Sequence, residues 1–144
     1  MPNRSVSKII ANRFFIAAPL DMSVGDAARL MREHRQGAVL VADDGHLLGI
    51  CTERDIVFDV VANGLDPVCT PVSAVMTTDP VAVGPDMPFG HALHLMFEGG
   101  FRHVPVVDIN GKVLGVISAR DALEIDMIRF KQELDRREAL TEVL

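Results

Sequence analysis

A seven-residue stretch at positions 115–121, Gly-Val-Ile-Ser-Ala-Arg-Asp, has a counterpart at positions 49–55, Gly-Ile-Cys-Thr-Glu-Arg-Asp. Each copy contains a glycine, two apolar residues, a hydroxyl side chain, one variable residue and then Arg-Asp. The two copies lie 66 residues apart in a chain of 144 residues. A repeat of this length predicts two copies of one structural unit, and each copy alone would be only marginally stable, so we expect them to pack together.

The similarity extends beyond the motif. At an offset of 66, residues 37–57 align with residues 103–123 and six positions are identical. At an offset of 65, seven residues between positions 21 and 33 match residues between positions 86 and 98. Most of these identities are apolar or turn residues, which a shared fold explains. The Arg-Asp pair is polar and follows an expected strand, so the fold alone does not require it.

Hydrophobic periodicity predicts the order strand, helix, two strands, helix in each unit. The expected fold class is α/β (α+β), with two β-α-β-β-α units packed sheet to sheet around a pseudo-two-fold axis. The expected segments are the first repeat at 6–63, a linker at 64–72, the second repeat at 73–124 and a C-terminal helix extension at 125–144. The second helix of the first repeat is expected to run from Thr52 to Gly64, and the last helix from Ala119 to about Leu140.

The last helix carries an apolar stripe formed by Leu123, Met127, Phe130 and Leu134. Two interpretations stay open for it. The helix is either a solvated amphipathic helix or an intersubunit contact, because its part beyond Arg129 has no counterpart in the first repeat.

Composition argues against several classes of function. The net charge is −6, there is no Trp or Tyr, and no Lys/Arg cluster stands apart from acidic residues, so a nucleic-acid-binding surface is not expected. No apolar run reaches the roughly 18 residues that a membrane span needs. Cys51 and Cys69 are unrelated thiols, which favours a reducing, cytoplasmic location. His91 and His94 have no visible third metal ligand, and no nucleophile–base pair or glycine-rich phosphate loop is evident, so neither a metal site nor an enzyme is expected.

The repeated motif has two chemical interpretations. A hydroxyl followed three residues later by a carboxylate, as in Thr52 and Asp55 or Ser118 and Asp121, is typical of a helix capping box. The same arrangement suits a nucleotide, because a helix start attracts phosphate, a carboxylate accepts hydrogen bonds from ribose hydroxyls, and a guanidinium binds phosphate. The recurrence of Arg54 and Arg120 favours the nucleotide.

The second half of the chain contains a series of short motifs in a fixed order: Met76-Thr77, Pro80-Val81, Arg102-His103-Val104-Pro105-Val106-Val107-Asp108, Asn110-Gly111, Leu114-Gly115 and Ser118-x-Arg120-Asp121. Their order and spacing resemble those of a CBS domain, named for cystathionine β-synthase. The first half resembles a more divergent copy, and the resemblance covers residues 6–124. It implies a pair with two clefts that binds AMP, ADP or ATP, or less commonly S-adenosylmethionine or NAD, in order to regulate an unidentified protein. It also implies a homodimer. The alternative is a ligand-free scaffold or protein-interaction module.

The resemblance also implies which residues form each cleft. One cleft combines Thr52, Arg54 and Asp55 with Thr78, Asp79, Pro80 and Val81 and with Arg102, His103, Val104 and Pro105. The other combines Ser118, Arg120 and Asp121 with Phe15, Ile16, Ala17, Gly37 and Ala38.

The first repeat departs from the family pattern in ways that favour the first cleft. It has Gln36-Gly37-Ala38-Val39 in place of Arg-His-x-Pro, and Phe14-Phe15 in place of Asp79-Pro80. Phe15 is expected either to fill the second cleft or to stack on a base. His103 is expected either to contact a phosphate or to be a surface histidine.

Overall fold

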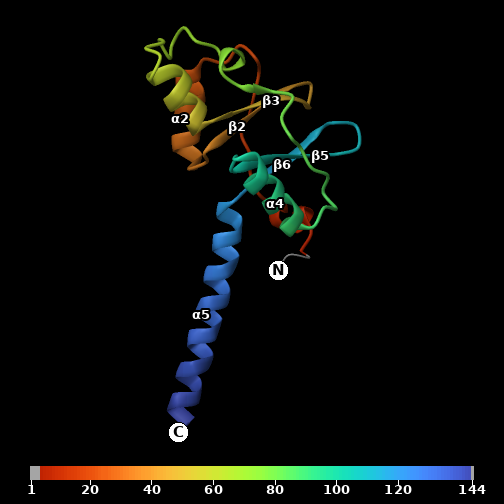
Figure 1. The fold of residues 1–144 in the computed structure, drawn as a ribbon, viewed down its shortest axis with the longest axis vertical. Helices are drawn as coiled ribbons and strands as arrows, with labels where there is room; N and C mark the ends of the chain where they lie inside the picture. The colour runs from red at the N-terminus through yellow and green to blue at the C-terminus, as the bar shows by residue number, and fades with distance from the viewer. Residues whose placement is uncertain (1–3, 144) are drawn as a thin grey trace.

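The computed structural model describes residues 4–143. In chain order the elements are α1 (Val6–Ile10), β1 (Ala17–Ala18), α2 (Val24–His34), β2 (Ala38–Asp43), β3 (His46–Thr52), α3 (Glu53–Asp55), the π-helix η1 (Ile56–Val61), the 3-10 helix η2 (Val72–Ala74), β4 (Thr77–Thr78), α4 (Phe89–Gly99), β5 (His103–Val107), β6 (Val113–Ser118) and α5 (Arg120–Val143). Figure 1 shows the two sheets next to one another and α5 extending away from them. The mixed α+β fold of two repeats is therefore confirmed.

Each repeat contributes one sheet. The first has the order β1-β2-β3-β4, in which β1 is parallel to β2 and the other neighbours are antiparallel. The second contains β5 and β6, and Val83 adds a parallel bridge to Val106. The extended segment before the first long helix of each repeat thus pairs with the sheet only briefly, at Ala17–Ala18 and at Val83.

Two short helices are exchanged between the repeats. Helix α1 begins the first repeat in the sequence, but Val6 and Ile9 are buried in the core of the second, where the Val6 N–H donates to the carbonyl of Met87 at 2.9 Å. The helix η2 lies where the linker meets the second repeat, but Val72 and Val75 are buried in the core of the first. Residues 6–10 therefore belong to the first expected repeat by sequence and to the second repeat by packing.

The motif glycines make this exchange possible. A Cβ atom on Gly115 would lie 3.1 Å from Cβ of Ile10, at the end of α1. A Cβ atom on Gly49 would lie 2.5 Å from Sδ of Met76, just beyond η2. Each exchanged helix thus rests against a strand at the one position without a side chain.

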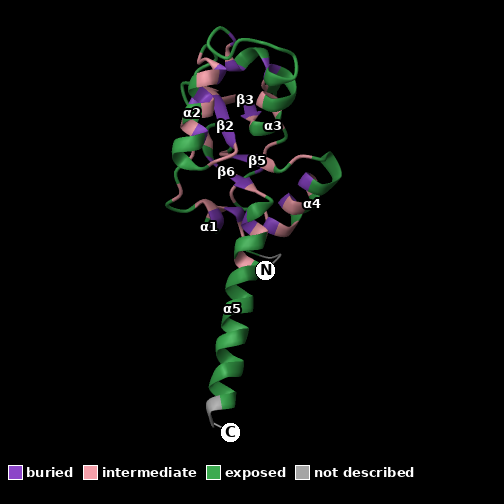
Figure 2. Ribbon diagram, turned by 90° about the vertical axis from the view of Figure 1, so that its left-hand side faces the viewer, coloured by how far each residue is buried: buried purple, intermediate pink, exposed green. Residues whose placement is uncertain are grey.

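A third apolar cluster joins the two sheets. Ala38, Leu40 and Ile50 of the first repeat are buried against Val113 and Val116 of the second, and Phe15 and Leu47 complete this interface cluster. The hairpin turns also bond to one another, because the Leu47 N–H donates to Gly111 at 3.1 Å and the Val113 N–H donates to Gly45 at 2.9 Å. Figure 2 shows that the buried residues concentrate around these strands.

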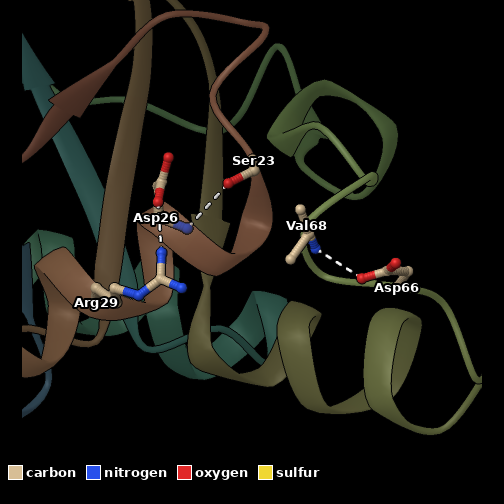
Figure 3. Close-up of polar contacts among 5 residues, drawn as sticks. All are labelled: Ser23, Asp26, Arg29, Asp66 and Val68. Carbon is tan, nitrogen blue, oxygen red and sulfur yellow. Dashed lines mark hydrogen bonds and ion pairs between the residues drawn. The ribbon is translucent and has the colours of Figure 1, made fainter.

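The linker between the repeats covers the start of α2. Ser23 caps this helix by accepting the Asp26 N–H at 3.0 Å, and Arg29 pairs with Asp26 (Figure 3). In the linker, Asp66 accepts the Val68 N–H at 2.9 Å (Figure 3). Two further N–H groups of the first turn donate to linker carbonyls: Val24 to Thr70 at 2.8 Å and Gly25 to Pro67 at 2.9 Å. The linker therefore satisfies donors that a helix start leaves without partners.

Two helices differ from the sequence expectation. The helix expected from Thr52 to Gly64 is capped by Thr52, but it is α-helical for only three residues, continues as the six-residue π-helix η1 and ends at Val61. Four of the six residues of η1 are β-branched, which crowds a regular α-helical turn. Helix α5 reaches Val143, slightly beyond the expected end, and is almost entirely exposed (Figure 2).

Within residues 4–143 no helix is both long and apolar enough to cross a bilayer.

The substitution Gly49→Ala tests the close contact between η2 and β3. The new methyl group would overlap Sδ of Met76 and would lie 2.9 Å from the carbonyl oxygen of Thr77. We expect a loss of about 1–3 kcal/mol in the free energy of unfolding. Thermal unfolding should show a midpoint lower by roughly 2–4 °C per kcal/mol.

Gly84→Ala is the matched control, because a Cβ atom on Gly84 would meet no atom within 4 Å. Its midpoint should equal that of the wild type or slightly exceed it, since alanine restricts the unfolded chain more than glycine does. Equal midpoints for the two variants would contradict the steric role of Gly49.

Candidate functional site

Both motifs cap the helix that follows them. In the first repeat, Oγ1 of Thr52 accepts the Asp55 N–H at 3.3 Å, and Oδ2 of Asp55 accepts the Thr52 N–H at 2.9 Å. In the second repeat, Oδ2 of Asp121 accepts the Ser118 N–H at 2.8 Å. The capping box is complete in the first repeat, and within residues 4–143 only its bond from backbone to aspartate is present in the second. The capping bonds use only Oδ2 of each aspartate, so the other carboxylate oxygen is left for a second role.

Two clefts lie between the repeats, one beside each motif. Cleft one, beside Asp55, has a volume of about 660 Å³, and cleft two, beside Asp121, has a volume of about 640 Å³. Both volumes are in the range of small-molecule sites. Glu53, Arg102 and His103 line both clefts and form a wall that they share.

Cleft one brings together most of its expected residues. Those that line it are Thr52, Arg54, Asp55, Asp79, Pro80, Val81, Arg102 and His103. Thr78, Val104 and Pro105 do not line it: Thr78 pairs with Gly49 in the first sheet, and Val104 and Pro105 are buried. Their contact with a ligand stays a prediction.

Cleft one also contains residues that the sequence pattern did not indicate. They are Ile50, Glu53, Val57, Phe58, Thr77 and Phe101. Most of them are apolar, so the cleft offers a hydrophobic surface close to Asp55. Phe58 could have been found, because it lies three residues after Asp55 and residues three apart share a helix face. The position of Phe101 depends on the other repeat.

The charges in cleft one are arranged around its rim. The Arg54 guanidinium donates to the carbonyl of Gly100 at 3.3 Å and lies 5.9 Å from the centre of the Phe58 ring. It therefore reaches from the first repeat to the second. Within residues 4–143, Oδ1 of Asp55 has no hydrogen bond, and neither Asp55 nor Asp79 forms an ion pair. The half-buried Asp55 thus presents an acceptor in an apolar cleft.

Cleft two is lined by its motif but not by the extended segment expected beside it. Ser118, Arg120, Asp121, Gly37 and Ala38 line it as expected. Phe15 and Ile16 do not: Phe15 packs in the interface cluster and Ile16 is buried in the core of the first repeat. The other lining residues, apart from the shared wall, are Arg13, His34, Arg35, Gln36, Val116, Ala119, Leu123 and Glu124.

In cleft two, Arg13 forms an ion pair with the motif aspartate, Asp121. Its Nη1 lies 2.8 Å from Oδ1 of Asp121, whose side chain is only 7% exposed. Both carboxylate oxygens of Asp121 are therefore engaged, Oδ2 by the Ser118 N–H and Oδ1 by Arg13. No local pattern around residue 13 indicated this contact.

His103 lies in the shared wall beside Glu53. A Cβ atom on Gly37 would lie 2.9 Å from Oε1 of Glu53 and 3.2 Å from Nε2 of His103, so the two side chains converge over Gly37. Burial lowers the pKa of His103, although the charges of Glu53 and Asp121 oppose this and that of Arg102 adds to it. We therefore expect a neutral imidazole at pH 7.

Cys51, which precedes the first motif threonine, is not a candidate nucleophile. Burial, followed by the charges of Asp55 and Asp59, raises the pKa of its thiol to about 12. A thiolate is the reactive form, so this cysteine acts as a small buried apolar residue.

The protonation of His103 can be measured by NMR. Its imidazole should titrate with a midpoint below 6.5, and Glu53→Gln should lower that midpoint further because the Glu53 charge favours the imidazolium. The signal is assigned by its loss in His103→Gln. Since folding disfavours the protonated form, His103 should also make the wild type lose stability as the pH falls below 6.5. A midpoint at or above 6.5 would contradict the burial of this side chain.

Comparison with known proteins gives the family of the chain. The CBS domain matches residues 6–61 and again residues 72–127. A putative signal-transduction protein with CBS domains from Burkholderia ambifaria has a similar structure, with a TM-score of 0.80 and 32% identity over 87% of this chain and 95% of that one.

Two further similar structures contain ligands. The CBS domain protein PAE2072 from Pyrobaculum aerophilum, solved in complex with AMP, has a TM-score of 0.75 and 26% identity over 82% of this chain and 89% of that one. The CBS domain pair of protein MJ0100, solved with 5-methylthioadenosine and S-adenosyl-L-methionine, has a TM-score of 0.78 and 25% identity over 89% of this chain and 99% of that one. With two matched domains that span most of its length, two capped motifs and two clefts between its repeats, this chain belongs to the CBS domain family.

Proposed function

We propose that this protein is a regulatory module that binds an adenine nucleotide of the AMP, ADP or ATP type in cleft one. The observation that carries the proposal is the half-buried Asp55, whose Oδ1 has no partner within residues 4–143 and which lies in an apolar cleft of about 660 Å³. A carboxylate in this setting accepts hydrogen bonds from neighbouring hydroxyl groups, which in a nucleotide are those of the ribose.

The other groups of cleft one suit the remaining parts of a nucleotide. Ile50, Val81 and Phe101 provide apolar surface for a purine base. Arg54 and Arg102 lie on the rim, where a guanidinium can pair with a phosphate through two hydrogen bonds. Similar CBS proteins bound to AMP, or to methylthioadenosine and S-adenosylmethionine, support an adenosine-containing ligand. S-adenosylmethionine and NAD are less favoured here than AMP, ADP or ATP.

The output of binding is a change of conformation. Cleft one takes Asp55 and Arg54 from the first repeat and Asp79 and Arg102 from the second. A nucleotide that contacts both repeats stabilises one relative arrangement of them, and its differential affinity for the two states sets the size of the shift. We propose that an unidentified protein reads this arrangement and that the module itself does not catalyse a reaction.

We also propose a homodimer. The helices that follow the two motifs expose large apolar side chains, namely Val57, Phe58 and Val61 on η1 and Leu123, Met127, Ile128, Phe130, Leu134 and Leu140 on α5. Exposed apolar surface of this kind is typical of a contact with another chain.

We further propose a cytoplasmic location, because Cys51 and Cys69 are both free thiols.

Thermal unfolding with AMP, ADP, ATP, S-adenosylmethionine and NAD, each added separately, tests the ligand. A nucleotide at 100 times its dissociation constant should stabilise the protein by about 2.7 kcal/mol. The midpoint should rise by roughly 2–4 °C per kcal/mol. Asp55→Asn should abolish the shift, because an amide loses the negative charge and one acceptor.

Asp21→Asn is the control, since Asp21 is an exposed carboxylate that does not line cleft one. It should keep the full shift. If none of the five ligands shifts the midpoint, the proposal is overturned in favour of the scaffold or protein-interaction module.

Sedimentation equilibrium tests the homodimer. The mass should be twice the 15.7 kDa of one chain. Phe130→Asp should shift the equilibrium toward the monomer, because it places a charge in the apolar stripe of α5. Gln132→Asp adds the same charge about 200° around the helix and should leave the dimer intact. A monomeric wild type, or equal effects of the two variants, would contradict a dimer that uses this stripe.

A further inference from the structure

We infer that Arg13 closes cleft two to nucleosides, so that each chain binds a single nucleotide although its fold contains two clefts. This inference rests on the proposed function of cleft one. It adds that Arg13 is a specificity-determining residue and that the two clefts, which share one architecture, are not equivalent.

The first observation is the state of the two motif aspartates. In cleft two, Arg13 occupies Oδ1 of Asp121 at 2.8 Å and the Ser118 N–H occupies Oδ2 at 2.8 Å. In cleft one, the Thr52 N–H occupies Oδ2 of Asp55, and Oδ1 has no partner within residues 4–143. Ribose hydroxyls can therefore reach Asp55 directly, but they can reach Asp121 only after its ion pair with Arg13 is broken.

Burial makes that ion pair costly to break. The side chain of Asp121 is 7% exposed and that of Arg13 is 33% exposed. Removing the partner of a buried carboxylate leaves a charge without compensation, and two hydroxyl groups compensate it less well than a guanidinium does. Arg13 thus competes with a ribose for the same oxygen atom.

The second observation is that the corresponding position in cleft one carries the opposite charge. The exchanged helices define this correspondence, because Ile10 contacts Gly115 as Met76 contacts Gly49, and both pairs are related by the offset of 66. The same offset relates Arg13 to Asp79. Arg13 lines cleft two and Asp79 lines cleft one. An acid at this position cannot neutralise the neighbouring motif aspartate, whereas an arginine can.

The backbone places Arg13 for this role. The Arg13 N–H donates to the carbonyl of Ile10 at 3.0 Å, so the chain turns directly after α1. Asn12 has a φ of 58°, and asparagine adopts this left-handed conformation more readily than most residues. Because α1 is packed against the second repeat, the turn directs the Arg13 side chain toward Asp121 of that repeat.

Isothermal titration with AMP tests the inference through the number of sites per chain. The wild type should bind one AMP, and Asp55→Asn should bind none. Arg13→Ala should bind two, because Oδ1 of Asp121 is then available. The double variant with Arg13→Ala and Asp55→Asn should bind one, which would place the new site in cleft two.

A matched control separates this effect from a general loss of positive charge. Arg35→Asn removes another arginine of cleft two without releasing Asp121, and asparagine suits the φ of 51° at this position. It should bind one AMP. Arg13→Gln serves as a second opening variant should Arg13→Ala prove unstable, and a thermal scan of each variant confirms folding.

Each result separates the inference from the proposed function. Two AMP molecules per wild-type chain, or one AMP for folded Arg13→Ala and Arg13→Gln, would overturn the role of Arg13 and leave cleft one as proposed. If AMP, and then ADP and ATP in the same titration, fail to bind to the wild type and to every variant, the nucleotide proposal itself is overturned.

Discussion

The contact between each exchanged helix and a motif glycine is the constraint on which the rest of the structure depends. Ile10 rests against Gly115 and Met76 lies against Gly49. A Cβ atom on Gly49 would overlap Met76 and the Thr77 carbonyl, and one on Gly115 would lie 3.1 Å from Ile10, which is tighter than most Cβ contacts. Helix α1 covers the core of the second repeat, and η2 covers the core of the first. The repeats therefore form a single folding unit. Arg13 and Asp79 each lie three residues after such a contact, so the contacts also place Arg13 beside cleft two and Asp79 beside cleft one.

A symmetric fold can therefore hold two different sites. The two motifs share one capping bond, since each aspartate accepts the N–H of the threonine or serine three residues earlier. The difference comes from the residue that the crossing segment brings to the cleft. An arginine there completes an ion pair with a buried carboxylate, whereas the motif aspartate beside Asp79 forms no ion pair within residues 4–143.

The shared wall of Glu53, Arg102 and His103 places the two clefts in contact through ionisable groups. Burial keeps His103 neutral near pH 7, while Glu53 and Asp121 favour its charged form. A phosphate bound in cleft one would add negative charge next to these groups and would further favour the charged form of His103.

The fold class, the two-repeat organisation and the helix caps could be predicted from the sequence, because periodicity and capping involve residues only a few positions apart. The composition of cleft one was largely predictable for a related reason: the motif residues Thr52, Arg54 and Asp55 and the segment at 79–81 are each contiguous in the chain, and a family pattern relates them. The π-helical turns of η1 were missed because β-branched residues fit an apolar helical pattern as well.

Other features were decided only by the tertiary structure. The packing of α1 on the second repeat, the burial of Phe15 between the sheets and the ion pair between Arg13 and Asp121 join residues that are far apart in sequence. Such contacts depend on how two repeats exchange their short helices, and no local pattern of charge or hydrophobicity encodes that choice. The sequence alone therefore determined that there are two motifs and one kind of fold, whereas packing decided that one motif aspartate is open and the other is paired.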